Sequence, residues 1–226
     1  MIRIEFQKEL DSLHQEIIKM GALVEAAINE AVLALMDMDC ERAQRVVEGD
    51  DVIDAMEREI DRLCVDIIAR QQPVASDLRD ITSTLKLITD LERIADHASD
   101  ISERVLVMCK QEERIPVPYD ISRMAEFSKN MLREALDSYV THNEKQAAQT
   151  IEMDAQVDEM YERIKTYLTH LMKVDSQSVD QLVELLLVSK YFERISDHAQ
   201  NVAEWVLYYI KGRHVSHLHE RSQQHE

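Results

Sequence analysis

Two short segments of this chain place a glutamate and an aspartate four residues apart, with a histidine directly after the aspartate. Residues 92–98 read Glu-Arg-Ile-Ala-Asp-His-Ala and residues 193–199 read Glu-Arg-Ile-Ser-Asp-His-Ala, so six of seven positions agree at an offset of 101. Residues four apart share one face of a helix, where two carboxylates repel each other. A shared cation relieves that repulsion, and such oxygen ligands suit iron, zinc, manganese or magnesium.

A second acidic pair lies upstream of each segment. Asp50 and Asp54 enclose three residues, as do Asp154 and Asp158, and these pairs align at an offset of 104. Each half of the chain therefore carries two acidic pairs in the same order, which indicates an internal duplication. If the pairs lie on facing helices, their carboxylates can bridge metal ions in the interior of a bundle.

In the Glu-x-x-x-Asp segments, the acids lie on the same side of the predicted helix as its apolar stripe. On a helical wheel Glu92 and Asp96 fall on the side of Leu78, Ile81 and Leu85, and Glu193 falls on the side of Leu182 and Leu186. A carboxylate directed toward a bundle interior must be paired, protonated or metal-bound. Arg93 and Arg194 offer the alternative of simple ion pairs.

The residues that follow each pair differ in what they predict. His97 and His198 lie ~100° from the preceding aspartate around a helix, which favours an interface or surface role over metal ligation. Asp100 and Asn201 extend the acidic stripe by one turn and are weaker candidate ligands.

Charge, apolar runs and cysteine spacing limit which partners the chain can bind and in which compartment it is expected. The net charge is −18, which disfavours binding to nucleic acid or to anionic membrane surfaces. No apolar run is long enough for a membrane span, and the first residues lack a signal-peptide profile. Cys40, Cys64 and Cys109 are odd in number and widely spaced, which indicates incidental thiols in a reducing compartment. These features predict a cytoplasmic protein without direct membrane insertion.

Apolar residues recur at helical spacing almost throughout, and only 3 Gly and 3 Pro interrupt the chain. Ser76 is expected to cap the start of the third helix and Gly212 the end of the sixth. Pro116 and Pro118 mark the best boundary between domains. The fold class is therefore all-α, with two tandem, pseudo-symmetric three-helix bundles over residues 1–113 and 119–212 and a His-rich, flexible tail over 213–226. The six helices are expected near residues 5–38, 41–70, 76–110, 120–142, 144–173 and 178–212.

The doubled segments resemble the signature of the PhoU family. The resemblance is carried by residues 88–98 and 193–201, by Gln72-Pro73-Val74-Ala75-Ser76-Asp77-Leu78-Arg79 and by Tyr208-Tyr209-Ile210-Lys211-Gly212, and it spans about residues 5–215. Two features differ: Ala95 and Ser196 replace the usual glycine, and residues 175–178 replace the proline turn of the first half.

The resemblance implies a negative regulator of phosphate uptake and phosphate-starvation signalling. Such a protein would act as an adaptor between the ATPase subunit of the phosphate ABC transporter and the phosphate-sensing histidine kinase, usually as a homodimer. It also implies multinuclear metal clusters on the acidic motifs. The candidate ligands by position are Asp50, Asp54, Glu92 and Asp96 in the first bundle, and Asp154, Asp158, Glu193 and Asp197 in the second.

The residues leave an alternative open. A carboxylate-bridged metalloenzyme or a metal-storage bundle would also use clustered acids, although helical di-iron proteins use Glu-x-x-His pairs. The sequence has no nucleophile–base constellation, glycine-rich phosphate loop or Walker motif. We therefore expect no enzymatic activity and no organic cofactor.

Overall fold

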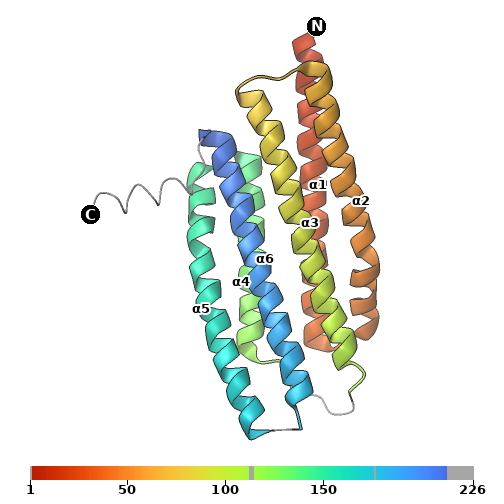
Figure 1. Cartoon of the computed structure of the whole chain (residues 1–226), viewed down its shortest axis with the longest axis vertical. Coiled ribbons are helices and arrows are strands. Elements are labelled where there is room, and N and C mark those ends of the chain that lie inside the picture. The colour runs from red at the N-terminus through yellow and green to blue at the C-terminus, as the bar shows by residue number, and fades with distance from the viewer. Residues whose placement is uncertain (1, 112–114, 176, 213–226) are drawn as a thin grey trace, which may run out of the picture.

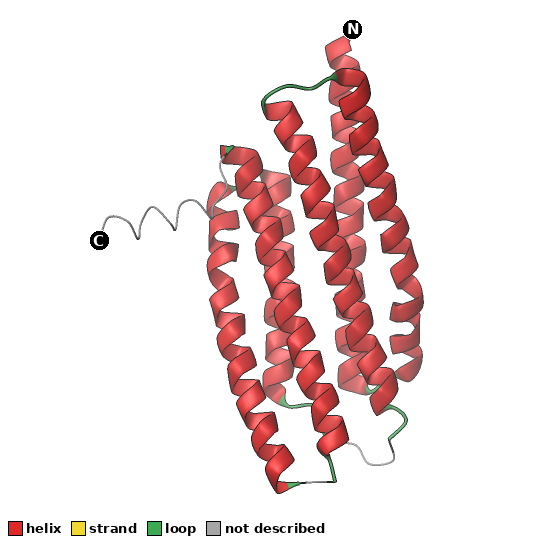
Figure 2. Ribbon diagram, viewed as in Figure 1, coloured by secondary structure: helices red, strands yellow, loops and turns green. Residues whose placement is uncertain are grey.

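The computed structural model describes residues 2–111, 115–175 and 177–212. Within these ranges every regular element is an α-helix, as the sequence predicts (Figure 2). The predicted tail over 213–226 lies outside the described residues. The helices are α1 (Ile2–Asp37), α2 (Cys40–Gln71), α3 (Ser76–Met108), α4 (Tyr119–Thr141), α5 (Glu144–Val174) and α6 (Val179–Lys211).

The six helices form two groups of three that lie side by side (Figure 1). Within each group all three helices contact one another, and the groups meet where α3 packs on α6 and α1 packs on α4. The outermost helices are α2 on one side and α5 on the other (Figure 1). This arrangement places the two helices that carry the Glu-x-x-x-Asp segments, α3 and α6, at the centre of the molecule.

The duplication extends to the way the second helix of each group begins. Asp39 caps α2 by accepting a hydrogen bond from the backbone N–H of Arg42 at 3.0 Å, and Asn143 caps α5 through Gln146 at 3.1 Å. These caps lie 104 residues apart, the offset of the upstream acidic pairs. A side-chain cap satisfies one of the free N–H groups at a helix start and contributes about 1 kcal/mol.

Two predicted helix ends have different outcomes. Gly212 caps α6 with a φ of 70°, a left-handed conformation that suits glycine, as predicted. Ser76 is instead the first residue of α3, and the cap position is held by Ala75 with a φ of 51° and no side-chain hydrogen bond. The predicted starts of α3 and α5 agree with the observed ones, and the other predicted bounds differ by one to three residues.

The core is continuous through both groups. Each helix buries an apolar stripe, with large side chains such as Leu13, Ile17 and Phe192 removed from solvent. Full burial of one such side chain stabilises a fold by about 1.5–3 kcal/mol. The glycine Gly21 lets α1 and α4 approach closely, because a Cβ there would lie 2.9 Å from Leu136.

Polar side chains join α3 to α6. The rings of His97 and His198 lie 5.6 Å apart between the two groups, as expected for interface histidines. The Asp90 carboxylate accepts hydrogen bonds from His198 Nδ1 at 2.8 Å, Asn201 Nδ2 at 3.0 Å and Trp205 Nε1 at 2.9 Å. Three bonds to one half-buried carboxylate fix the register between α3 and α6.

The interpretation of the cysteines is wrong for two of the three. Cys40 begins α2, Cys109 follows the end of α3, and the two form a disulfide with a Cα–Cα distance of 6.3 Å. They are 69 residues apart in sequence, and only the antiparallel return of the helices brings them together. Cys64 is free and buried, and burial raises the pKa of its thiol to about 12.

The second group ties the corresponding helix ends differently. Glu144 begins α5 and pairs with Lys211 at the end of α6, with Nζ and Oε1 2.7 Å apart. At the two offsets of the repeat, Glu144 corresponds to Cys40, and Lys211 corresponds to the neighbour of Cys109.

None of the described helices combines the length and the apolar character that a membrane crossing requires.

Candidate metal centres

The acids of the first group meet between α2 and α3. One carboxylate oxygen from each of Asp50, Asp54 and Asp96 lies within 4.8 Å of the other two. Asp50 and Asp54 come from consecutive turns of α2, and Asp96 comes from the facing turn of α3. Three convergent carboxylates from two helices form an oxygen ligand set of the kind that hard cations take.

Burial and mutual repulsion both act on this cluster. Burial, followed by the neighbouring carboxylates of Asp96 and Asp54, raises the pKa of Asp50 to about 6. Burial also raises the pKa of Glu92, and Asp96 adds to that effect. A raised carboxyl pKa means that the charged form lacks enough positive charge or hydrogen bonds around it. The cluster is therefore short of counter-charge.

Arginines supply part of that charge, as the ion-pair alternative requires. Arg93 Nη1 lies 2.8 Å from Asp96, and Arg93 Nε lies 3.4 Å from Glu92. Arg58 Nη1 lies 3.4 Å from Asp54. Both guanidinium groups are more than half exposed, so these pairs are screened by water. The Glu92 oxygen nearest Arg93, Oε2, is buried and accepts no hydrogen bond.

The acids of the second group lie between α5 and α6 in the corresponding place. Burial, followed by Asp197 and Asp158, raises the pKa of Asp154 to about 6. Burial and Glu193 raise the pKa of Asp197. Asp154 Oδ1 and Glu193 Oε2 are buried and accept no hydrogen bond. Asp158 is exposed, and among the described residues no second set of three acids converges as closely as the first.

A lysine distinguishes the second cluster from the first. Lys190 Nζ donates a hydrogen bond to Glu193 Oε1 at 2.5 Å and lies 5.1 Å from the centre of the Tyr161 ring. The residue at the corresponding place in α3, at the offset of 101, is Thr89. The second cluster therefore contains the Lys190 ammonium as a cation of its own. Arg194 adds little, because its Nη1 lies 4.0 Å from Asp197.

The weaker candidate ligands face the contact between the two groups. Asp100 Oδ2 lies 3.2 Å from His97 Nδ1, and Asn201 donates its amide to Asp90. Asp100 still contributes to the raised pKa of Asp50, whereas Asn201 is occupied by the facing helix.

Sequence reasoning missed Arg58 and Lys190. Each lies three or four residues from an acid on its own helix, so the spacing was available as a signal. The difference between Thr89 and Lys190 also appears as soon as the two halves are aligned.

The fold and these clusters define a class of protein: a duplicated all-α chain with carboxylate clusters between the second and third helix of each repeat. Glu92, Asp154 and Glu193 each carry a buried oxygen that accepts no hydrogen bond, so the donor set at both places is compatible with a cation. The family model described as the PhoU domain matches residues 5–105 and again residues 121–206. The chain belongs to the PhoU family.

Relatives and solved structures agree with this assignment. The chain is 38% identical to the phosphate-specific transport system accessory protein PhoU homolog of Clostridium acetobutylicum, over 95% of this chain and 98% of the relative. It is 34% identical to the accessory protein PhoU of Escherichia coli, over 95% of this chain and 88% of the relative. The crystal structure of PhoU from Pseudomonas aeruginosa matches with a TM-score of 0.89 and 38% identity, over 92% of this chain and 100% of that one. That of the phosphate transport system regulatory protein PhoU from Streptococcus pneumoniae matches with a TM-score of 0.87 and 28% identity, over 93% and 99%.

Proposed function

We propose that this chain is a regulatory accessory protein of phosphate uptake. The observation that carries the proposal is the similarity over 95% of the chain to relatives named as accessory proteins of the phosphate-specific transport system. In this role the chain acts in the cytoplasm as a homodimer. It links the ATPase subunit of the phosphate ABC transporter to the phosphate-sensing histidine kinase, and it represses phosphate uptake and starvation signalling when phosphate is ample.

Direct binding tests this proposal. The purified chain is immobilised and exposed to the transporter ATPase subunit and, separately, to the cytoplasmic part of the sensor kinase, each with and without added Mn²⁺. We expect saturable binding to both. In cells, deletion should derepress a phosphate-starvation reporter in phosphate-rich medium, and the intact gene should restore repression. No binding to either protein, together with an unchanged reporter, would rule out the adaptor role.

We propose further that a divalent or trivalent metal ion, such as iron, zinc, manganese or magnesium, is held by the acidic clusters. Asp50, Asp54 and Asp96 would hold it in the first bundle, with Glu92 beside them. A bound cation would supply positive charge that neutralises these carboxylates. Asp50 and Asp54 belong to α2 and Asp96 to α3, so ligation would tie the two helices together.

In the second bundle the residues in the corresponding positions are Asp154, Asp158, Glu193 and Asp197. The Lys190 ammonium already offsets one carboxylate there, and a metal would have to compete with it. The difference supports tighter metal binding in the first bundle. A change in metal occupancy would then act mainly on the packing of α2 against α3.

A metalloenzyme or a metal-storage bundle is the alternative. The shared observation is the convergence of three carboxylates. The histidines after the motifs contact each other between the bundles, so the Glu-x-x-His arrangement of helical di-iron sites does not form around Asp96. Elemental analysis with an oxygen-uptake assay separates these functions. Bound metal without oxygen consumption, combined with a phosphate-dependent deletion phenotype, favours the regulator.

A further inference from the structure

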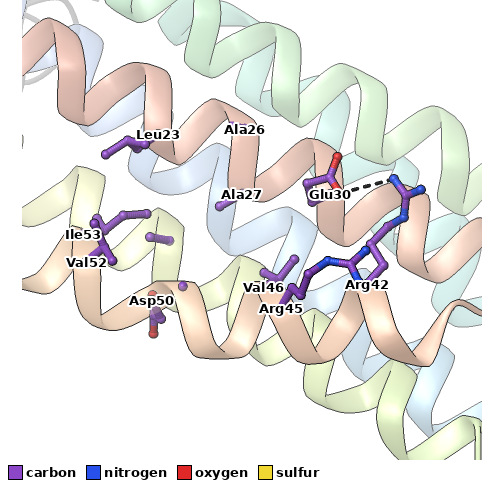
Figure 3. A pocket seen from close by; sticks show the side chains of 12 residues that line it. Leu23, Ala26, Ala27, Glu30, Arg42, Arg45, Val46, Asp50, Val52 and Ile53 are labelled. Carbon is purple, nitrogen blue, oxygen red and sulfur yellow. Dashed lines mark hydrogen bonds and ion pairs between the residues drawn. The ribbon is translucent and has the colours of Figure 1, made fainter.

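An apolar groove runs between α1 and α2 on the first bundle (Figure 3). It encloses a cavity of about 350 Å³. Its walls are mostly aliphatic, and two of the larger side chains, Leu23 and Val52, are 41% and 58% exposed. The apolar walls are built chiefly from Leu23, Ala26, Ala27, Val46, Val52 and Ile53. A concave apolar site of this size is typical of small-molecule pockets, which run from ~300 to ~1,000 Å³.

Small residues open the groove in the first bundle, and their counterparts in the second are larger. At the offset of 104, Ala27 corresponds to Met131 and Gly49 corresponds to Met153. Met131 is fully buried in its bundle, and Met153 packs against the core. A Cβ added at Gly49 would meet nothing within 4 Å, so no close helix contact requires a glycine there. The hollow is therefore a property of the first bundle and not a necessity of the repeated fold.

The two bundles also differ in charge at one end of the groove, where the first bundle carries positive side chains and the second does not. Arg42 and Arg45 lie together there, beside Val46 (Figure 3). Their counterparts in the second bundle are the neutral Gln146 and Gln149. Arg42 pairs with Glu30 at 3.2 Å and with Asp39 at 3.4 Å. Arg45 helps to lower the pKa of Asp39 but forms no ion pair within 4.0 Å in the described part of the chain. On a chain of net charge −18, two neighbouring guanidinium groups at the end of an apolar groove offer a local place for an anion.

We propose that this groove binds a single-chain anionic amphiphile, with its alkyl chain along the aliphatic walls and its carboxylate or phosphate head group at Arg45 and Arg42. Asp50 also lines the groove, apart from the two arginines, and its carboxylate belongs to the acidic cluster between α2 and α3 (Figure 3). Guanidinium groups bind both head groups through paired N–H donors. The alkyl chain gains affinity because its burial removes apolar surface from water.

Calorimetric titration of the full chain tests this proposal with three probes that share one alkyl chain: decanoate, decyl phosphate and the neutral decanol. We expect one saturable site for at least one anionic probe and binding at least about tenfold weaker for decanol, the difference that one charge-assisted contact makes. The better anionic probe identifies the head group, and either result supports the site.

Two variants copy the second bundle into the first. Gly49→Met should fill the groove and weaken binding of the anionic probe by about tenfold or more. Arg45→Gln should weaken it by about five- to tenfold without filling the groove. Arg62→Gln is the matched control, because Arg62 lies on the same helix, is 74% exposed and pairs with no residue but Glu59 among those that the structure describes.

Circular dichroism checks that each variant keeps its helices. The proposal fails if neither anionic probe gives saturable heat with the unmodified chain. It also fails if both Gly49→Met and Arg45→Gln bind as tightly as the Arg62→Gln control.

Discussion

The two bundles of this chain repeat one backbone but balance their charges and fill their interiors differently. The first ties the ends of α2 and α3 with the Cys40–Cys109 disulfide, whereas the second uses the Glu144–Lys211 ion pair. The first gathers three carboxylates at one point, whereas the second places Lys190 among its acids. The first is also hollow beside Gly49.

The difference shows which positions the fold needs and which it leaves free. The caps that begin α2 and α5, the left-handed residues before those caps and the buried stripes agree between the halves, because the helices need them to turn and pack. Counter-charges and groove residues differ, because several solutions are compatible with the same packing. Features that are specific to one bundle are therefore the ones from which to infer specific functions.

The disulfide should produce the largest difference between the bundles. Cys40→Ser/Cys109→Ser should lower the free energy of unfolding by about 4 kcal/mol, because the closed loop spans 69 residues. Glu144→Gln should cost less than about 1 kcal/mol, because an exposed ion pair contributes little. Urea unfolding of oxidised protein measures both. Thiol-reduced unmodified protein should unfold like the serine variant, and equal costs for the two changes would remove this distinction.

Changes at the contact between the bundles, where α3 packs on α6, should give the next largest loss of stability. Asp90→Ala removes the acceptor of three hydrogen bonds and should cost about 2–3 kcal/mol. The residue at the matching place in α6 is Tyr191, whose ring stacks on His97 at 5.7 Å. Tyr191→Phe keeps the ring and should cost less than about 0.5 kcal/mol. Thermal unfolding compares the two variants. A larger loss of stability for Tyr191→Phe than for Asp90→Ala would contradict this account of the contact between the bundles.

Exchanging the residue that differs between the acidic clusters should move metal affinity by about tenfold. Lys190→Thr removes the internal cation and should strengthen binding of Mn²⁺ in the second bundle, since about 1.4 kcal/mol corresponds to tenfold. Thr89→Lys should weaken binding in the first bundle. Calorimetric titration of metal-free protein measures both constants. Unchanged affinity in both variants would show that Lys190 does not compete with a metal.

The smallest expected effect is a pH dependence of stability from the His14–Asp80 pair, which is present in the first bundle and not in the second. His14 Nε2 lies 3.0 Å from Asp80, and that hydrogen bond raises the pKa of His14 above its usual value against the opposing effect of burial. At the position matching Asp80, the neutral Gln181 accepts a hydrogen bond from the backbone N–H of Ile115 at 2.8 Å. The pH dependence of this contact should therefore be confined to the first bundle.

Because protonated His14 is favoured in the folded state, its stabilisation is complete below the ordinary histidine pKa of about 6.5. It is lost as the pH rises through the raised folded-state pKa of His14. The loss should be less than about 1 kcal/mol. Urea unfolding at acidic and alkaline pH should show it in the unmodified chain and not in His14→Gln. The same pH dependence in both proteins would place it elsewhere.

The sequence was sufficient for the fold, because an apolar period of 3.6 residues and few glycines or prolines leave little but long helices. It was sufficient for the acidic pairs, because both halves repeat them. It could not give the convergence of Asp50, Asp54 and Asp96, which depends on the rotation of α2 against α3. The Cys40–Cys109 pairing depends likewise on how the helices return, whereas the role of Lys190 was within reach of an alignment of the two halves.

Metal content of the two clusters tests the central claim most directly. The chain is purified without chelator and analysed for metals beside two double variants, Glu92→Ala/Asp96→Ala and Glu193→Ala/Asp197→Ala. Circular dichroism checks that all three are folded. Tighter binding in the first bundle predicts that the first variant loses most of the metal and the second retains most of it. Equal metal content in the first variant and the unmodified chain would contradict a first-bundle site.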